Sequence, residues 1–473
     1  MQQRSNIAAR RWVGGFFLSL WLCSTVFGSL AGRIGKAVQS QEGGDFAVQV
    51  IKPGSGATVY SYSARRLLIP ASNMKLITTA AALKYLGRDF EYKTVVGLCG
   101  DTLVVIGSGD PLLGDKATDT ELGRESGWIF EKISQALRER GVREVNDIVI
   151  DTTVFDNQRV HPSWPANDYN KWYACEVCGL NYNDNCIEVT ASNVSGAVAI
   201  EIDPATKFVQ FTNEVRAISS GEGAVGSNRS PQPNRITIFG RCKNREGPFK
   251  VAIEQPGAFF GVLLAEHLGR GGIAVRGKVI ERGVAENCKL SRLVEFDTPI
   301  ANVLERANTD SLGLAAEALL KTIDAYSNTN HKNGSWAGGR ELVRRYLSGL
   351  GIAPDEFKLD DGSGLSRENR LSANAITTVL LNLYKSDNWE RFRASLAVGG
   401  EGGTIDRYFS EPKYRGKIFG KTGYISGVRA LSGVCLTQDG PYIFSVLSNG
   451  PKGLSRDAIN DIAKAIIDEY STN

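Results

Sequence analysis

Apolar and polar residues alternate along a short stretch near the start of the chain. From Phe46 to Val50 every second residue is apolar, as in a strand with one buried face, and Lys52-Pro53-Gly54 follows as a turn. From Leu76 to Leu83 the apolar residues recur at the spacing of a helix. We therefore expect a strand hairpin followed by a helix that begins near Ser72 and ends at Gly87.

The C-terminal end of the chain carries a second amphipathic pattern. Ser455 precedes a helix whose apolar residues form one stripe: Ile459, Ile462, Ala463, Ile466, Ile467 and Tyr470. Upstream, apolar runs at residues 430–436 and 442–447 are separated by Asp439-Gly440, a pair typical of tight hairpin turns. The two chain ends together predict one α/β unit in which N- and C-terminal helices cover an antiparallel sheet.

The middle of the chain, from about residue 98 to residue 295, has a different pattern. Short β-type runs separated by turns cover residues 102–106, 147–150, 198–202 and 235–239. A segment rich in Gly, Ser and Pro at residues 219–234 predicts a loop. We expect a β-rich insertion with a smaller subdomain inside it. Gly107-Ser108-Gly109 is a turn after a strand rather than a dinucleotide loop, because Pro111 and the glycine spacing break that fingerprint.

The N-terminus has the features of an export signal. The 20 residues from Trp12 to Ala31 carry no charge and follow the basic pair Arg10-Arg11. The stretch closes with the small-residue pattern Ser29-Leu30-Ala31, so we interpret residues 1–31 as a secretory signal peptide cleaved near its end. An uncleaved anchor stays open as the alternative, because 20 uncharged residues can just span a bilayer.

The composition is that of a folded protein and gives no argument for nucleic acid. Of 473 residues 42% are hydrophobic and 22% charged, and 55 basic residues nearly balance 51 acidic ones. Seven cysteines follow the leader, an odd number, so in an exported protein we expect disulfides and at least one free thiol, with the pairing open. Cys175-Glu176-Val177-Cys178 has no second Cys-x-x-Cys partner, so no metal is expected.

Ser72-Asn73-Met74-Lys75 places a hydroxyl and an amine three residues apart where a helix is expected to begin. On a helix these side chains share a face, so a neutral Lys75 can take the proton of Ser72 and make it a nucleophile. A helix N-cap is the structural alternative for Ser72. The same pattern occurs again at Ser410-Glu411-Pro412-Lys413, where the proline disfavours a helical turn.

Lys421-Thr422-Gly423 is a second candidate motif, placed before the apolar runs near the C-terminus. Serine enzymes that react with penicillin combine Ser-x-x-Lys, a middle Ser-x-Asn and Lys-Thr-Gly in this order. Ser311-Leu312-Gly313 stands at the middle place, in a stretch that continues as an apolar helix. Two motifs match, and the middle one lacks its asparagine.

Three further segments match landmarks of one family: residues 107–113, 308–317 and 361–373. With the motifs above, the chain from about Phe46 to its end resembles the D-alanyl-D-alanine carboxypeptidases/endopeptidases of the penicillin-binding protein 4 type. The resemblance implies an α/β (α+β) fold, a penicillin-binding, β-lactamase-like domain with an antiparallel sheet flanked by helices. It also implies that this domain, at residues 32–97 and 296–473, is split by an inserted β-rich region at residues 98–295.

The resemblance implies a chemical role for each motif residue. Ser72 would attack a carbonyl group, with its own backbone N–H and that of Tyr424 stabilising the oxyanion. Lys75 would be the base, its pKa lowered by burial and by the second cation Lys421. Ser311 would relay a proton to the leaving amine, although a plain helix start is the alternative.

Substrate recognition is implied for a second group of residues. Lys421 and Thr422 would hold the terminal carboxylate of a D-alanyl substrate, and Gly423 and Tyr424 are further substrate-binding residues. Asp168 matches an acid from the insertion that faces the free amine of a diaminopimelate side chain, and a solvated loop aspartate is the alternative. Gly313 departs from the family pattern, and neither Ser372-Ala373-Asn374 nor the chain end replaces the missing asparagine. We expect slow peptidase activity that Gly313→Asn accelerates, unless the backbone there needs a positive φ.

The sequence therefore predicts an exported serine-type D-Ala-D-Ala carboxypeptidase or endopeptidase of the periplasm or cell envelope. It would act on peptidoglycan stem peptides, be acylated by β-lactams and need no cofactor. Peripheral membrane association is left open. A β-lactamase would need a deacylating base, for which no Glu-based motif is present. From another class, the missing asparagine leaves a catalytically weak wall-binding or scaffolding protein as the alternative.

Overall fold

Two segments that lie far apart in the sequence form one six-stranded sheet. The computed structural model describes residues 29–41, 43–327, 333–450 and 456–471. The strand order is β18-β19-β20-β21-β1-β2, and every neighbouring pair is antiparallel. The strands are β1 (Asp45–Lys52), β2 (Ala57–Tyr62), β18 (Ala397–Val398), β19 (Ile418–Ile425), β20 (Val428–Thr437) and β21 (Gly440–Asn449). Both predicted hairpins, β1 with β2 and β20 with β21, are confirmed.

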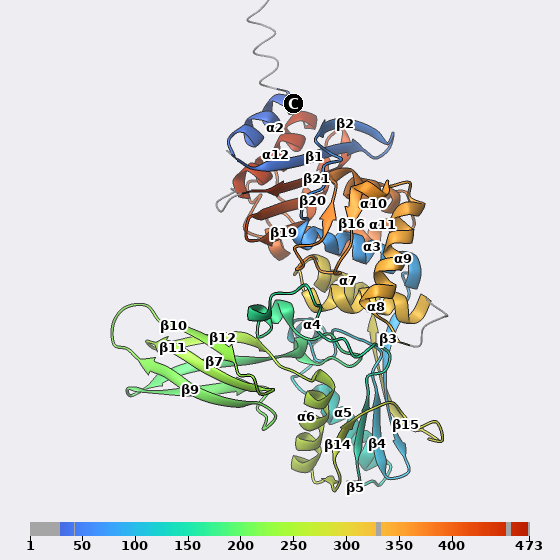
Figure 1. Ribbon diagram of the computed structural model, residues 1–473, viewed down its shortest axis with the longest axis vertical. Helices are drawn as coiled ribbons and strands as arrows, with labels where there is room; N and C mark the ends of the chain where they lie inside the picture. Colours follow the sequence, from blue (N-terminus) through green and yellow to red (C-terminus); the bar gives the residue numbers. More distant parts are fainter. Residues whose placement is uncertain (1–28, 42, 328–332, 451–455, 472–473) are drawn as a thin grey trace, which may run out of the picture.

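Helices cover both faces of this sheet (Figure 1). On one face, α2 (Leu30–Gln39) and α12 (Arg456–Tyr470) share a core with the alternating apolar residues of β1. On the other face lie α3 (Met74–Leu86), α7 (Ile300–Asn308), α8 (Gly313–Ser327), α9 (Trp336–Gly349), α10 (Ala373–Tyr384) and α11 (Trp389–Ala394). The predicted arrangement of an antiparallel sheet flanked by helices is confirmed. Ser455 and residues 1–28 of the expected signal peptide lie outside the described residues.

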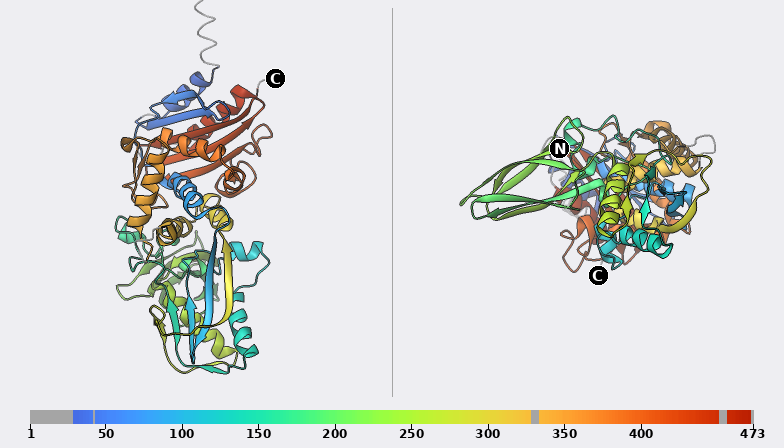
Figure 2. Two further views of the ribbon diagram at one scale, coloured as in Figure 1. Left: turned by 90° about the vertical axis from the view of Figure 1, so that its right-hand side faces the viewer. Right: turned by 90° about the horizontal axis from the view of Figure 1, so that it is seen from below.

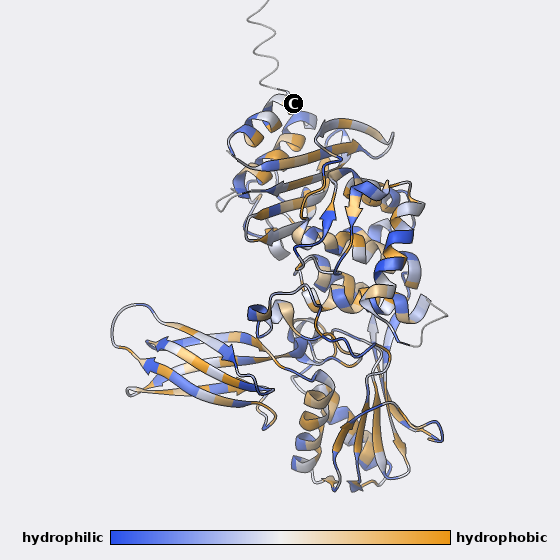
Figure 3. Ribbon diagram, in the orientation of Figure 1, coloured by the Kyte–Doolittle hydropathy of each residue, from blue (hydrophilic) through white to orange (hydrophobic). Residues whose placement is uncertain are grey.

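α3 and α8 are both largely enclosed in this layer. Every residue from Met74 to Leu83 is buried, Lys75 included, because α7, α8, α9 and α10 surround α3. Figure 3 shows hydrophobic residues gathered in this layer and hydrophilic residues on α9 at its outside. An unpaired charged amine is costly in such surroundings. The fold therefore bears directly on the protonation of Lys75.

The chain between α3 and α7 forms a second lobe and an arm (Figure 1). The lobe holds a sheet of order β14-β6-β4-β3-β15, with α5 (Trp128–Glu139) and α6 (Pro256–Arg270) packed against it. Its strands are β3 (Glu91–Cys99), β4 (Thr102–Ile106), β6 (Ile148–Asp151), β14 (Val279–Glu281) and β15 (Ser291–Pro299). The short α4 (Lys116–Glu121), β5 (Glu144–Val145) and β13 (Ala274–Val275) complete it.

The expected domain boundaries fall inside strands that pair with each other. β3 enters the lobe and β15 leaves it, side by side and antiparallel. The boundaries after residues 97 and 295 would cut both strands, because a composition change along the chain does not show where a sheet begins. The division into domains stays a prediction.

Two three-stranded sheets, of order β12-β7-β8 and β10-β11-β9, form an arm that projects to one side (Figure 2). The strands are β7 (Cys186–Val194), β8 (Ala197–Asp203), β9 (Gln210–Ala217), β10 (Ala224–Arg229), β11 (Arg235–Cys242) and β12 (Arg245–Ala252). The loop expected at residues 219–234 is wrong in part, because β10 lies within it. Small and polar residues suit this edge strand, since Ser227 is its one buried residue and the Phe239 ring covers Gly226.

One disulfide, between Cys99 and Cys288, closes a loop of the second lobe. The other described cysteines are free and buried: Cys175, Cys178, Cys186, Cys242 and Cys435. The expectation of a disulfide with thiols left over is confirmed. Within the part of the chain that the structure describes, no helix has the length and hydropathy of a membrane span.

Candidate active site

Ser72 lies in a 3-10 turn, Ala71–Asn73, which leads directly into α3. The expected helix begins two residues after Ser72, so this serine is neither its N-cap nor part of its first turn. The spacing still brings the two functional groups together, with Nζ of Lys75 3.1 Å from Oγ of Ser72. The Asn73 amide donates to the backbone carbonyl of Lys421 at 2.8 Å, which ties the start of α3 to β19.

Lys75 is buried, and its amine has a second partner. Nζ donates a hydrogen bond to the backbone carbonyl of Ser363 at 2.8 Å. Burial lowers the pKa of Lys75 to about 8, and the carboxylates of Glu317 and Asp361 oppose that effect. The amine is therefore held in place by a neutral acceptor, with two carboxyl groups nearby.

Two buried carboxylates shape the loop that offers this carbonyl. Glu317 on α8 accepts hydrogen bonds from the N–H groups of Gly362 at 2.9 Å and Ser363 at 2.7 Å. It also accepts one from the Trp336 indole at 2.8 Å. Burial, then the nearby Asp361, raises the pKa of Glu317 to about 7. Glu317 thus holds the two peptide groups that come directly before the Ser363 carbonyl, the acceptor of Lys75.

Asp361 holds the rest of the loop and connects it to the insertion. Its carboxylate accepts from the N–H groups of Gly364 at 2.8 Å and Ser366 at 2.6 Å. It also accepts from the indole of Trp164, a residue of the insertion, at 2.8 Å. The insertion is therefore hydrogen-bonded to the loop that positions Lys75.

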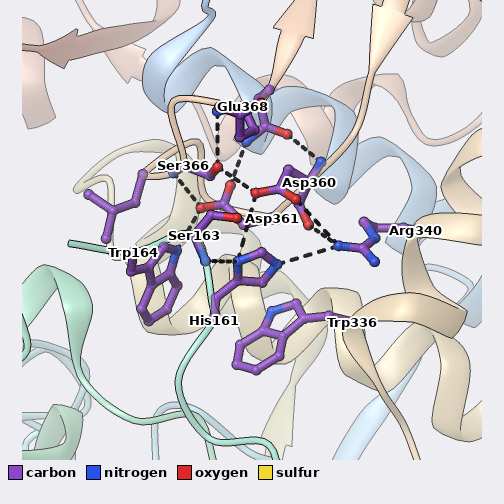
Figure 4. A network of polar contacts seen from close by, with 12 residues as sticks. His161, Ser163, Trp164, Trp336, Arg340, Asp360, Asp361, Ser366 and Glu368 are labelled. Carbon is purple, nitrogen blue, oxygen red and sulfur yellow. Dashed lines mark hydrogen bonds and ion pairs between the residues drawn. The ribbon is translucent and has the colours of Figure 1, made fainter. Parts of the chain in front are cut away.

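A buried histidine lies beside this connection (Figure 4). The imidazole of His161 lies between Asp360, 3.8 Å from Nδ1, and Arg340, 3.5 Å from Nε2. Its ring meets the Trp336 ring edge-on at 5.1 Å. Burial lowers the pKa of His161, with the charge of Arg340 acting in the same sense and the carboxylates of Asp361 and Asp360 opposing. His161 is therefore packed against α9 and the loop at residues 360–361, and burial favours its neutral form.

Lys421 lies on β19, fully buried, with Nζ donating to the carbonyl of Thr422 at 3.0 Å. Burial, followed by the charge of Lys75, lowers its pKa well below the ordinary value. The Thr422 hydroxyl bonds that of Thr404 at 2.9 Å. Glycine is required at 423, because a Cβ there would stand 2.6 Å from the carbonyl of Pro70. This close contact lets β19 approach the Ser72 turn.

A cavity of about 500 Å³ opens over Ser72 and Lys75. Of the other predicted site residues, Ser311, Asp168 and Tyr424 also line it. Lys421, Thr422 and Gly423, on β19, are not among the residues that line it. Tyr424 is 58% exposed at the rim. Among the described residues no cluster of His, Cys, Asp or Glu could hold a metal ion.

Ser311 and Gly313 differ in backbone conformation. Ser311 has a φ of 65°, a left-handed geometry that a plain helix start does not need. Gly313 is the first residue of α8 and is not among the positive-φ residues. A Cβ at Gly313 would meet the carbonyl of Tyr173 at 3.2 Å and Cβ of Ser363 at 3.9 Å. The insertion therefore occupies part of the space that an asparagine would use.

Asp168 ends a short 3-10 turn, Ala166–Asp168, at the cavity wall. It lies beside the hydroxyl of Tyr173, whose pKa is raised by burial and then by this carboxylate. No ion pair to Asp168 is formed by the residues that the structure describes. Its carboxylate therefore lines the cavity without a cationic partner among the described residues.

Sequence reasoning did not assign roles to Glu317 or to the carbonyl of Ser363. Both lie in segments that match the family, but a match of sequence does not show which atoms form hydrogen bonds with each other. A glutamate inside the apolar run from Leu312 to Ile323 was the available signal, because a buried carboxylate needs hydrogen-bond donors.

The chain is similar to known proteins along most of its length. The profile of the D-Ala-D-Ala carboxypeptidase 3 (S13) family matches residues 30–472. A D-alanyl-D-alanine carboxypeptidase from an Actinomadura species is 28% identical over 459 residues, covering 91% of this chain and 82% of that protein. The crystal structure of penicillin-binding protein 4 from Haemophilus influenzae has a TM-score of 0.79 at 21% identity, covering 93% of this chain and 99% of that one. The resemblance inferred from the motifs, and the fold it implied, are confirmed.

Gly313→Asn is best compared with Gly313→Ala, because both variants place a Cβ against Tyr173. We expect the alanine variant to react with benzylpenicillin more slowly than the wild type, since the Tyr173 carbonyl must shift. The asparagine variant should react up to about tenfold faster than the alanine variant, because a neutral hydrogen bond contributes roughly 0.5–1.5 kcal/mol. The measurement is the second-order acylation rate constant. Equal constants for two folded variants would show that the bound penicillin gains nothing from an amide at this position.

Proposed function

Because the chain belongs to the D-Ala-D-Ala carboxypeptidase 3 (S13) family, we propose that it cleaves D-Ala-D-Ala termini of peptidoglycan stem peptides through an acyl-enzyme on Ser72. The observation that supports this most is the 3.1 Å separation of the Ser72 hydroxyl from a buried lysine amine at the floor of a cavity. Few other arrangements make a serine nucleophilic without a histidine.

Lys75 acts as the general base in this proposal. With a pKa of about 8, Lys75 carries a neutral amine in about a tenth of the protein molecules at pH 7. A lysine at its ordinary value would be neutral in less than about one in a thousand. The amine accepts the Ser72 proton as Oγ attacks the carbonyl carbon of the penultimate D-alanine. The backbone N–H groups of Ser72 and Tyr424 stabilise the oxyanion, and Ser311 passes the proton to the leaving D-alanine. Water then releases the acyl group.

Lys421 and Thr422 recognise the terminal carboxylate. Burial beside Lys75 disfavours the charged form of Lys421 in the free protein. An arriving carboxylate favours the charged form, so its binding raises the pKa of Lys421 and is accompanied by proton uptake. Asp168 adds recognition at the other end of the substrate, where its carboxylate meets a side-chain amine.

We place the activity in the periplasm or cell envelope, reached through the N-terminal signal peptide. Cross-linked stem peptides are the second class of substrate, because their cleavage attacks the same D-alanyl carbonyl. β-Lactams inhibit by acylating Ser72. Among the residues that the structure describes, Asp168 is the one carboxylate that lines the cavity, and it lies in the insertion. That position offers no deacylating base next to Ser72 and disfavours a β-lactamase.

Ser72→Ala should abolish covalent labelling by a fluorescent penicillin, because the variant has no nucleophile beside Lys75. Ser410→Ala is the matched control, since it removes the exposed serine of the other Ser-x-x-Lys sequence, which forms no helix. That variant should label like the wild type. Gel fluorescence measures the label, and thermal unfolding checks that both variants fold. Labelling that survives Ser72→Ala would assign the nucleophile to another residue.

Asp168→Asn should weaken the hydrolysis of peptides that carry a free side-chain amine. The variant loses a charge-assisted contact, so we expect kcat/KM for these peptides to fall about tenfold or more. The same peptides with the amine acetylated serve as control and should lose little. The measurement is kcat/KM for both peptides under steady-state conditions. Equal losses on both would show that Asp168 has only a structural role in its loop.

A further inference from the structure

A second cavity, of about 610 Å³, lies next to the catalytic one. Its walls come from the arm, from the end of α7 and from the insertion segment that precedes the arm. The residues used below are Lys171, Trp172, Phe249, Lys250, Arg306 and Asp310. Nothing in the proposed reaction uses this space.

Two chain segments form a wall that both cavities share. In one segment, Ser311 and Gly313 line the catalytic cavity, whereas Asp310 and Leu312 line the second cavity. In the other segment, Asp168 and Tyr173 face the catalytic cavity and Lys171 faces the second one. Trp172 lines both and is 37% exposed. A ligand that fills the catalytic cavity can therefore continue over Trp172 into the second cavity.

Of the described cations that line the second cavity, one has no acidic partner among the described residues. Arg306 pairs with Asp115, at 2.9 Å through two nitrogens, and with Asp310. Lys250 pairs with Asp184 at 2.5 Å. Lys171 forms no ion pair with any residue that the structure describes.

The backbone of Lys171 is nevertheless fixed. Its N–H donates to the carbonyl of Asp168 at 2.7 Å, and the residue forms a β-bridge with Val251. An anchored backbone, an unpaired ammonium group and the apolar faces of Trp172 and Phe249 make a subsite for a negatively charged organic group.

We propose that the second cavity binds a carboxylate on a part of the peptide substrate that extends beyond the residues held in the catalytic cavity, with Lys171 as its partner. This inference rests on the proposed peptidase function and adds a determinant of substrate choice. Stem peptides contain acidic residues upstream of their D-alanines, and a cross-linked substrate contains two such peptides. The subsite favours long acidic or cross-linked peptides over short neutral ones.

The test uses two peptides that both end in D-Ala-D-Ala and have the same upstream extension. In one peptide the extension carries a glutamate carboxylate, and in the other this group is an uncharged amide. For the wild type we expect kcat/KM to be about three- to tenfold higher for the acidic peptide, the effect of one partly exposed charge pair. Lys171→Met should bring this ratio close to one, and Lys171→Arg should retain most of it.

Lys243→Met is the matched control, because Lys243 is an exposed lysine in the turn between β11 and β12 of the arm, outside both cavities. It should keep the wild-type ratio. The ratio of kcat/KM for the two peptides does not depend on the amount of active enzyme. It can therefore be measured for a variant that folds only in part. A wild-type ratio of one, or a ratio that Lys171→Met leaves unchanged, overturns the subsite. Failure of the proposed function gives a different result, namely no hydrolysis of either peptide and no penicillin label on the wild type.

Discussion

The hydrogen bond from the buried Lys75 amine to the carbonyl of Ser363 is the contact on which the rest of the site depends. An amine enclosed by helices needs an acceptor, and a neutral carbonyl holds it without restoring its charge. The two carboxylates that fix this loop, Glu317 and Asp361, also limit how far the pKa of Lys75 falls. The balance leaves it at about 8, low enough for a base and high enough to accept a proton from serine.

Four separate parts of the chain must meet for this balance to exist, and one of them is the loop that carries Asp361 and Ser363. α3 supplies Lys75, α8 supplies Glu317, and the insertion supplies the Trp164 indole that bonds Asp361. Gly423 allows β19 to approach the Ser72 turn closely. The insertion therefore belongs to the catalytic arrangement as well as to substrate recognition, since it holds the loop behind Lys75 and covers Gly313 with Tyr173.

The sequence was sufficient for elements that follow a local pattern. The hairpins, the helix that ends at Gly87 and the Ser72–Lys75 spacing all follow from periodicity and from short motifs. The strand at Ala224–Arg229 could not be predicted from its local pattern, because an edge strand needs few buried side chains. Its glycine is covered by a ring from another strand. The role of Glu317 depends on donors from residues 336, 362 and 363, and only the folded chain shows which of these meet.

A direct titration of Lys75 tests the central claim that burial against a carbonyl keeps its amine partly neutral. Lysine labelled with ¹³C at the ε carbon reports each side chain by NMR, and the Lys75 signal is the one lost in Lys75→Met. We expect a pKa of about 8 for Lys75 in the wild type and a lower pKa in Glu317→Gln, because the carboxylate removed there raises the pKa of Lys75. A Lys75 that titrates near the ordinary value of 10.5, unchanged by Glu317→Gln, would contradict the account.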